Sequence, residues 1–412
     1  MTTGVFGAGL GPAVGRRELD LVTPAAAVAI PLQYAYIFAF NHAPEGIRTA
    51  IAVALLLVHV TLAGFALSRR IDAWQTAILS AIFLMVGCWL IAHGANPKST
   101  EFNIVYAVRD LSILVMPLWL LTFPERLPHR MILLLAIGST VAGGLIALLG
   151  PPVFVSGTPR LASITGGPVQ MHASAMFLAL QLILLTEYYR GRQLFGAIYW
   201  PLCLFAVAVL IGYGGRNEFV ILASYFGALA YFRYSYMPVV RWSPPIVLVF
   251  VVMMAALALT FGHNVGEWGS GRIGVWQNRL ELIWGRNVLT FLFGGGLSAD
   301  LIWNPQWWWM DEVNAHNDFL HFTMKTGLVG LLAILLFLGG LLMRMPGSSK
   351  AIIIALILSS FFSNGFLQTP LLAFNLFLVV AVGLHQWRLR AERIHNLRVE
   401  HRRLVNRGMQ AV

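Results

Sequence analysis

The sequence predicts an all-α protein that crosses a membrane about twelve times, and two observations carry this prediction. Of its 412 residues, 58% are apolar and only 11% are charged, whereas a soluble protein carries roughly a quarter charged residues. Apolar runs of about 18 or more residues recur along the chain, close to the roughly 20 residues that a helix needs to cross a bilayer core. We therefore expect a polytopic helical membrane protein.

The expected spans form a single transmembrane domain, 1–387, which is followed by a basic tail, 388–412. The shortest span, 350–364, is expected to be tilted or partly re-entrant. Cys88 and Cys203 both fall within spans, so we expect packing residues and no disulfide framework. The spans are 22–40, 47–67, 74–93, 103–123, 130–150, 168–188, 193–212, 217–236, 244–262, 318–343, 350–364 and 367–387.

Lysine and arginine positions orient these spans. With the N-terminus inside, 19 of the 28 lysines and arginines fall in inside segments, seven in outside segments and two within spans. Cytoplasmic loops are enriched in these residues, so we expect both termini in the cytoplasm and the one long loop, 263–317, outside. The same rule explains the net charge of +11 without a nucleic-acid partner, and the basic tail is expected to contact anionic membrane lipids.

The long external loop contains an amphipathic helix pattern. Arg272, Trp276, Arg279, Ile283 and Arg286 recur at helical spacing and therefore share one face. Arginines on such a face suit an anionic ligand or lipid headgroups. We expect this loop to lie on the outer boundary between membrane and water, with Arg272 and Arg279 as candidate ligands of a diphosphate.

Charged residues inside spans are costly in a bilayer and usually functional. Arg109, Asp110, Glu218 and Lys325 all fall in the outer half of the bilayer under the expected topology, and His172 starts a span at the same level. The simplest interpretation is one outward-facing polar cavity, although structural ion pairs would explain the same residues. Adjacent residues do not face each other on a helix, so we expect Arg109 to pair with Glu218 and Asp110 with Lys325.

The densest polar stretch of the chain is 311–321, just before a long apolar helix. His316 can accept a proton near neutral pH, and Asn317 beside it can set its tautomer. Arg216 follows two glycines at the start of a span, where a helix N-terminus and an arginine favour an anion. Together with Arg272, these residues suggest glycosyl or phosphoryl transfer from an anionic lipid-linked donor.

Metal-ligand spacing, a Walker loop and a dinucleotide fingerprint are all missing from the sequence. His316 and His321 lie five residues apart, which is not the spacing of two ligands on one helix face. We therefore expect no metal and no cofactor, and a donor that resides in the membrane.

Several of these motifs resemble the O-antigen ligase and O-antigen polymerase family of bacterial envelope glycosyltransferases. Residues 315–320, Ala-His-Asn-Asp-Phe-Leu, followed by 325–330, resemble the family's H-N-x-aromatic-L stretch and the helix after it. Residues 270–276 resemble its G-R-x-x-x-W stretch, and 294–296 its glycine-rich turn. Gly215 and Arg216 stand where the family commonly has Ser-Arg, and 168–172 lacks the family's usual Pro-Asn.

This resemblance implies an inverting, metal-independent transfer at the external face of the bacterial inner membrane. The donor would be a glycan on undecaprenyl diphosphate, with His316 as the base and Arg216 and Arg272 binding the diphosphate. A polymerase would extend another lipid-linked repeat unit, whereas a ligase would transfer the glycan to lipid A core, and the sequence does not separate the two firmly. A glycan flippase or chain-length regulator would be a partner. A transporter is the alternative of a different class, but its site is expected near the midplane, at broken helices in paired repeats.

Overall fold

The computed structural model describes residues 22–410 except 40–42, 69–70, 96–103, 156–157, 165–170, 192–195, 215–216, 238–271, 303–314, 363–366 and 368. The prediction of an all-α protein is confirmed, and the described residues add one short hairpin. The helices are α2 (Val22–Ala39), α3 (Glu45–Leu67), α4 (Ala73–Ala95), α5 (Ile104–Leu120), α6 (His129–Leu149), α7 (Met171–Gly191), α8 (Gly196–Tyr213), α9 (Asn217–Tyr234), α12 (Arg272–Trp284), α13 (Val288–Phe293), α14 (Asp318–Arg344), α15 (Lys350–Phe362) and α16 (Pro370–Gln410). Strands β1 (Val153–Val155) and β2 (Thr158–Arg160) pair antiparallel.

Each expected span except 244–262 is a helix, and 244–262 lies outside the described residues. Within the part of the chain that the structure describes, seven helices are long and apolar enough to cross a membrane: α3, α4, α6, α7, α8, α14 and α16. The segments Val22–Phe38 and Lys350–Phe361 are shorter apolar helices. The chain therefore has the helices of a membrane-embedded protein.

Helix α7 and the N-terminal part of α16 lie at the centre of the molecule. In their most apolar segments, 89% and 83% of the residues are buried, against 28% for α3 and 33% for α4. A helix that is buried all round belongs to the interior, whereas a peripheral helix leaves one face outside. On the outer helices that face carries large apolar side chains such as Leu57, Phe83, Leu134 and Leu204, each more than half exposed. Such a surface suits contact with lipid.

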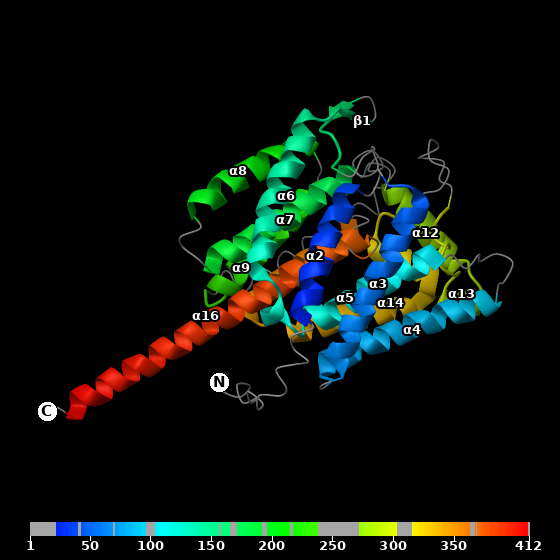
Figure 1. Cartoon of the computed structure of the whole chain (residues 1–412). Helices are drawn as coiled ribbons and strands as arrows, with labels where there is room; N and C mark the ends of the chain where they lie inside the picture. Colours follow the sequence, from blue (N-terminus) through cyan, green and yellow to red (C-terminus); the bar gives the residue numbers. More distant parts are fainter. Residues whose placement is uncertain are drawn as a thin grey trace.

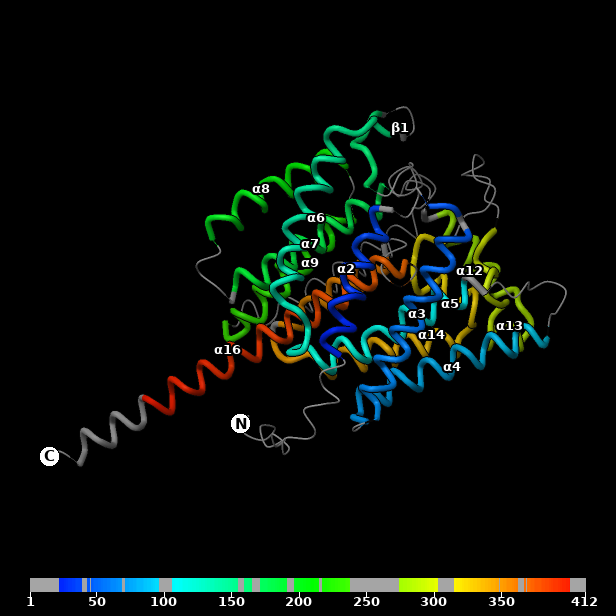
Figure 2. The backbone as a smooth tube through the Cα atoms, in the orientation of Figure 1, coloured from blue at the N-terminus to red at the C-terminus, as the bar shows by residue number. Residues whose placement is uncertain are grey.

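The long helix α14 packs along α4 (Figure 2). Helix α15 packs along α9. Helix α14 is broken at Gly327, whose φ of 65° and ψ of −161° are non-helical. The break frees the carbonyl groups of Met324 and Lys325, which accept hydrogen bonds from the backbone N–H groups of Gly295 and Gly296 at 3.0 and 3.1 Å. The glycine-rich turn is thus joined directly to the helix that follows His316.

Two glycines make this junction sterically possible. A Cβ atom on Gly294 would lie 2.2 Å from the Lys325 carbonyl oxygen, and one on Gly327 would lie 2.4 Å from the Leu292 backbone. Both glycines also have positive φ, which side chains disfavour. The two backbones can approach this closely only because neither position carries a side chain.

The amphipathic pattern of the long loop does form a helix, α12. Its inner face buries Val275, Arg279 and Ile283, while Leu280 and Trp284 are exposed. This helix packs against α14, and its exposed apolar residues suit the membrane boundary that the sequence predicts.

Helix α16 includes most of the basic tail that the sequence predicts at 388–412. It continues to Gln410, so it is about 60 Å long at roughly 1.5 Å per residue, and its C-terminal part projects from the body (Figure 1). Its first arginines pair with other helices, Arg388 with Glu125 and Arg390 with Glu187.

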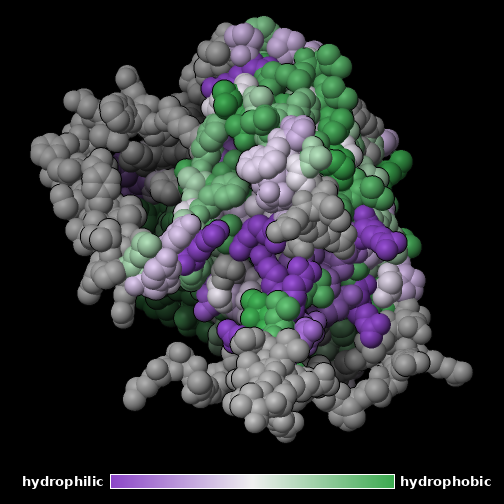
Figure 3. Space-filling model, turned by 90° about the vertical axis from the view of Figure 1, so that its left-hand side faces the viewer, coloured by the Kyte–Doolittle hydropathy of each residue, from purple (hydrophilic) through white to green (hydrophobic). Residues whose placement is uncertain are grey.

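On the side seen in Figure 3, hydrophilic residues gather in one region and hydrophobic residues cover much of the rest.

Candidate functional site

The backbone before His316 is clamped on both sides. The N–H of Ala315 donates to the Asp300 carboxylate at 2.9 Å, and the Ala315 carbonyl accepts from the indole N–H of Trp276 at 2.8 Å. Ala315 itself is fully buried. The loop and α12 therefore hold the residue before His316 in place.

The residue after His316 is fixed as well. Asn317 is the N-cap of α14: its side-chain oxygen accepts from the N–H of Leu320 at 3.0 Å, which satisfies a free donor of the first helical turn. Its amide group donates to the carbonyl of Phe361 on α15 at 2.9 Å. Asn317 thus locks the start of α14, and with it the position of His316.

Between these two clamps, His316 has a φ of 46°. It is the one non-glycine residue with a positive φ among those the structure describes. Such backbone strain persists where the surroundings over-determine the conformation, and it concentrates at functional sites. The strain is an observation independent of the sequence motif, and it falls on the residue that the motif singles out.

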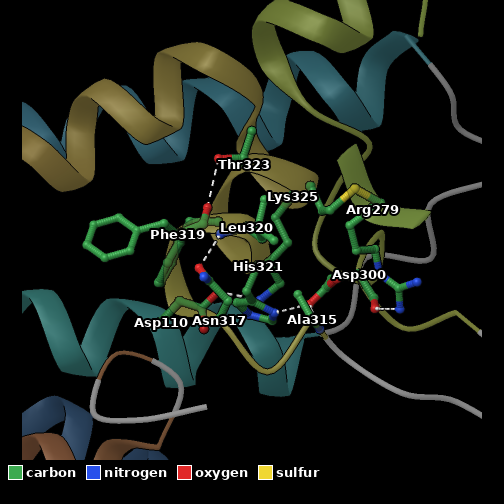
Figure 4. A network of polar contacts seen from close by, with 12 residues as sticks. Asp110, Arg279, Asp300, Ala315, Asn317, Phe319, Leu320, His321, Thr323 and Lys325 are labelled. Atoms are coloured by element: carbon green, nitrogen blue, oxygen red, sulfur yellow. Dashed lines mark hydrogen bonds and ion pairs between the residues drawn. The ribbon is translucent and has the colours of Figure 1, made fainter. Parts of the chain in front are cut away.

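One buried carboxylate, Asp300, organises this region (Figure 4). Its oxygens accept from Arg279 Nε at 3.0 Å, from the Ala315 N–H at 2.9 Å and from His321 Nδ1 at 2.7 Å. Arg279 Nη2 also donates to the Asp300 backbone carbonyl at 3.2 Å. Burial alone raises the pKa of the Asp300 carboxyl, but the hydrogen bonds from His321 and Ala315 and the nearby positive charge bring that pKa below its ordinary value.

Sequence reasoning missed Asp300 because it is a lone acidic residue in a loop. Its partners lie on α12, in the loop before α14 and on α14, and their spacing in the sequence does not indicate that they lie close together. The nearest signal was Arg279 on the inner face of a predicted helix, since a buried arginine requires an acceptor.

Arg279 does not lie where a diphosphate ligand would lie. Its side chain is 0% exposed, Nε and Nη2 are bound to Asp300, and Nη1 is bound to the side chain of Asn278 at 3.1 Å. The expectation of an open anion ligand is therefore corrected: this guanidinium supports the carboxylate that holds the loop.

His321 is the second histidine of the site, and sequence reasoning gave it no role. The carboxylate can only accept, so Nδ1 of His321 carries the proton in their 2.7 Å hydrogen bond. Nε2 is buried and has no hydrogen-bond partner among the described residues. A carboxylate that fixes the tautomer of a histidine and leaves the other nitrogen bare is a recurring arrangement in proton-transfer sites.

One turn further along α14, Lys325 forms the ion pair that the sequence predicted. Its Nζ donates to Asp110 on α5 at 2.6 Å, and both groups are buried. The expected pairing of Arg109 with Glu218 is wrong: Arg109 Nε bonds to its own neighbour Asp110 at 3.2 Å. Neighbouring Cβ atoms diverge on a helix, but the long arginine side chain folds back across the ring of Tyr106, 4.7 Å from its centroid.

Glu218 lies in a different pair from the one that the sequence predicted. Its partner is His172 at the start of α7, with 3.8 Å between Nδ1 and Oε1. Both Glu218 oxygens are buried without a hydrogen bond in the described structure. Arg216, which precedes α9, lies outside the described residues, and Arg272 begins α12 with its side chain outside them.

Among the described residues, the cluster around Asp110 and Asp300 carries more cations than anions. Three cationic side chains, Arg109, Arg279 and Lys325, are paired with two carboxylates. An excess positive charge in a poorly hydrated setting stabilises an anionic ligand or leaving group. Within the described residues, no group of three or more His, Cys, Asp or Glu side chains could hold a metal ion.

Comparison with known proteins adds no assignment. No family model matches the chain, and no similar sequence is found among curated proteins.

Proposed function

We propose that the protein is a membrane glycosyltransferase that transfers a glycan from a lipid diphosphate to an acceptor hydroxyl. The observation that carries this proposal is the strained His316, held between clamped neighbours beside a buried cluster with excess positive charge. A general base must be fixed in position, and a diphosphate leaving group needs positive charge nearby. The arrangement supports both requirements.

In the proposed reaction, His316 accepts the proton of the acceptor hydroxyl. The hydroxyl oxygen forms a bond to the anomeric carbon as the bond from that carbon to the diphosphate oxygen breaks. The electron pair leaves with the lipid diphosphate, and the configuration at the anomeric carbon inverts. Arg216 and Arg272 bind the diphosphate, which is anionic before and after bond cleavage.

The residues of the Asp300 network position the base in this scheme. Asp300 and Trp276 hold Ala315, and Asn317 holds the first turn of α14. Arg279 neutralises the buried Asp300 carboxylate. These residues need not touch the substrate, and their proposed role is to keep His316 in the orientation that proton transfer requires.

We further propose twelve spans in a bacterial inner membrane, with both termini in the cytoplasm and His316 at the external face. The asymmetry of lysine and arginine supports this orientation. The break in α14 at Gly327 is placed between protein segments, where non-helical backbone is tolerated within a membrane. The exposed apolar face of α12 supports a position of the loop at the boundary.

Among acceptors, we propose a second lipid-linked repeat unit, which makes the protein a polysaccharide polymerase. A ligase would use the same donor and base with lipid A core as the acceptor. The test is to incubate purified protein with an undecaprenyl-diphosphate-linked oligosaccharide, alone or with lipid A core, and to measure released undecaprenyl diphosphate and product length. Products of two or more units formed without lipid A core support the polymerase. No release of undecaprenyl diphosphate with either acceptor would remove the proposal.

A further inference from the structure

A cavity of about 360 Å³ lies between α2, α3, α5, α7 and the start of α16. Most of its wall is apolar, with Ile37, Leu55, Phe177 and Leu372 among the lining residues. Its volume is in the range of small-molecule sites, roughly 300–1,000 Å³. None of the residues clamped around His316 lines it, so it is separate from the loop site already described.

The cavity adjoins the charged cluster through Arg109. Asp110 bonds to both Arg109 and Lys325, so among the described residues one carboxylate faces two cations and the cluster has an excess of one positive charge. Lys325 is buried, whereas Arg109 lines the cavity and its side chain is 25% exposed. A charge excess within an apolar protein is costly unless an anion offsets it. Arg109 therefore offers this cavity a binding position for an anionic group.

The depth of the cavity follows from helix geometry. Trp119 lies ten residues after Arg109 on α5 and so roughly 15 Å away along the helix. Its indole N–H donates to His59 Nδ1 at 3.2 Å, and His59 lines the cavity. The space thus extends about 15 Å from Arg109 to His59. A volume of about 360 Å³ holds roughly a dozen water-sized groups. Spread along this depth, such a volume has room for one hydrocarbon chain.

The deep end of the cavity is polar. The indole of Trp119 can only donate, so Nδ1 of His59 accepts and a neutral ring carries its proton on Nε2. His59 lines the cavity end opposite Arg109, and this nitrogen is buried without a partner in the described structure. A hydrocarbon chain gives this nitrogen no hydrogen bond, so the apolar part of the cavity ends at this depth.

We propose that this cavity binds a lipid phosphate with a single chain, with the phosphate at Arg109 and the chain extending toward His59. A lipid with several chains does not fit the volume. In the proposed function Arg216 and Arg272 bind the donor diphosphate, so this cavity is a lipid site separate from the donor site. The inference itself requires only the cavity and the excess positive charge of the cluster, so it can hold or fail independently of glycosyl transfer.

Three probes separate the chain from the phosphate. Farnesyl diphosphate carries both, farnesol carries the chain alone, and inorganic diphosphate carries the anion alone. Binding of each to the detergent-solubilised full chain is measured by native mass spectrometry, which gives the number of bound molecules and their affinity. We expect one farnesyl diphosphate bound at the cavity, weaker binding of farnesol, and still weaker binding of inorganic diphosphate.

Two variants and one control locate this binding. Val53→Trp fills the cavity from its open side, because Val53 lines it and is 37% exposed. Arg109→Gln removes the excess positive charge but leaves the Asp110–Lys325 pair. Leu57→Trp is the control, since Leu57 lies one turn further along α3, is 62% exposed and does not line the cavity. The unfolding temperature of each variant checks that it is folded.

We expect Val53→Trp to weaken farnesyl diphosphate and farnesol at least tenfold. Arg109→Gln should weaken farnesyl diphosphate to a similar extent and leave farnesol unchanged, and Leu57→Trp should alter neither. Equal farnesyl diphosphate affinity in the wild type and in Val53→Trp would overturn the proposal, as would a loss of farnesol binding in Arg109→Gln equal to the loss of farnesyl diphosphate. If the cavity variants behave as expected but no glycan is transferred, the proposed function fails and the lipid site stands.

Discussion

The substitution Asp300→Asn tests the network that holds His316. The amide keeps the shape of the carboxylate but loses its charge and half of its accepting capacity. Each hydrogen bond to a charged partner contributes roughly 1.5–3 kcal/mol. Leaving the fully buried Arg279 without its counter-charge raises the expected loss of unfolding free energy to about 3–5 kcal/mol.

The activity of Asp300→Asn should separate a positioning role from a general loss of folding. The donor diphosphate is bound elsewhere in the proposed site, so we expect KM for the donor to stay close to the wild-type value. A displaced base lowers kcat by about 10- to 100-fold. Asp300→Glu restores the charge at a displaced position and should recover only part of the rate. The control is Asp72→Asn, which removes an exposed carboxylate outside the site.

The pH dependence of the same variant gives a further check. The pKa of Asp300 in the folded protein is below its ordinary value, which is about 3.9 for aspartate. The carboxylate therefore stabilises the fold fully above about pH 4, and this stabilisation is lost as pH falls through the lower folded-state pKa. The difference in unfolding temperature between wild type and Asp300→Asn should be constant from pH 8 to about 5, and should become smaller below about pH 4. A gap that widens on acidification, or an unchanged kcat in the folded variant, would refute the reasoning.

Three further predictions concern the structure around the site. Gly327→Ala should destabilise the protein by at least about 1–3 kcal/mol, because φ is positive and the new Cβ would meet the Leu292 backbone. The control Gly339→Ala, with open space around it, should be neutral or stabilising. Thermal unfolding of both variants tests this difference. Lys325→Met leaves Asp110 and Arg109 in the interior without the third charge of their cluster, and should lower the unfolding free energy by about 3–5 kcal/mol. The double variant with Asp110→Asn should recover part of that loss. Purely additive losses would count against an energetic coupling between Lys325 and Asp110. Treatment with EDTA should leave glycan transfer unchanged, and activity that returns only with an added divalent ion would reveal a metal requirement.

The sequence predicted those parts of the site that depend on helix periodicity and depth. Lys325 and Asp110 were matched because both are charged, both are buried in spans and both lie at the same expected level. His316 and Asn317 were noticed because polar residues cluster just before an apolar helix. Each of these predictions follows from local pattern and from the cost of charge in a membrane.

The parts that were missed depend on side-chain reach and on loop geometry. The rule that adjacent residues do not face each other on a helix describes Cβ directions, and the flexible side chain of Arg109 overcomes it. Asp300 and His321 meet only after α12, the following loop and α14 have packed together. The break at Gly327 was equally hidden, because a single glycine in an apolar run does not show that another backbone will lie against it.

The central claim is that His316 is the base for glycan transfer, and the most direct measurement is the transfer rate of His316→Ala at matched expression. Loss of a general base typically lowers a rate by roughly 10²–10⁴-fold, and donor affinity should remain near the wild-type value because the arginines are intact. His395→Ala, which replaces an exposed histidine on the projecting part of α16, serves as the matched control and should transfer glycan at the wild-type rate. A folded His316→Ala protein that releases undecaprenyl diphosphate as fast as the wild type would contradict the account.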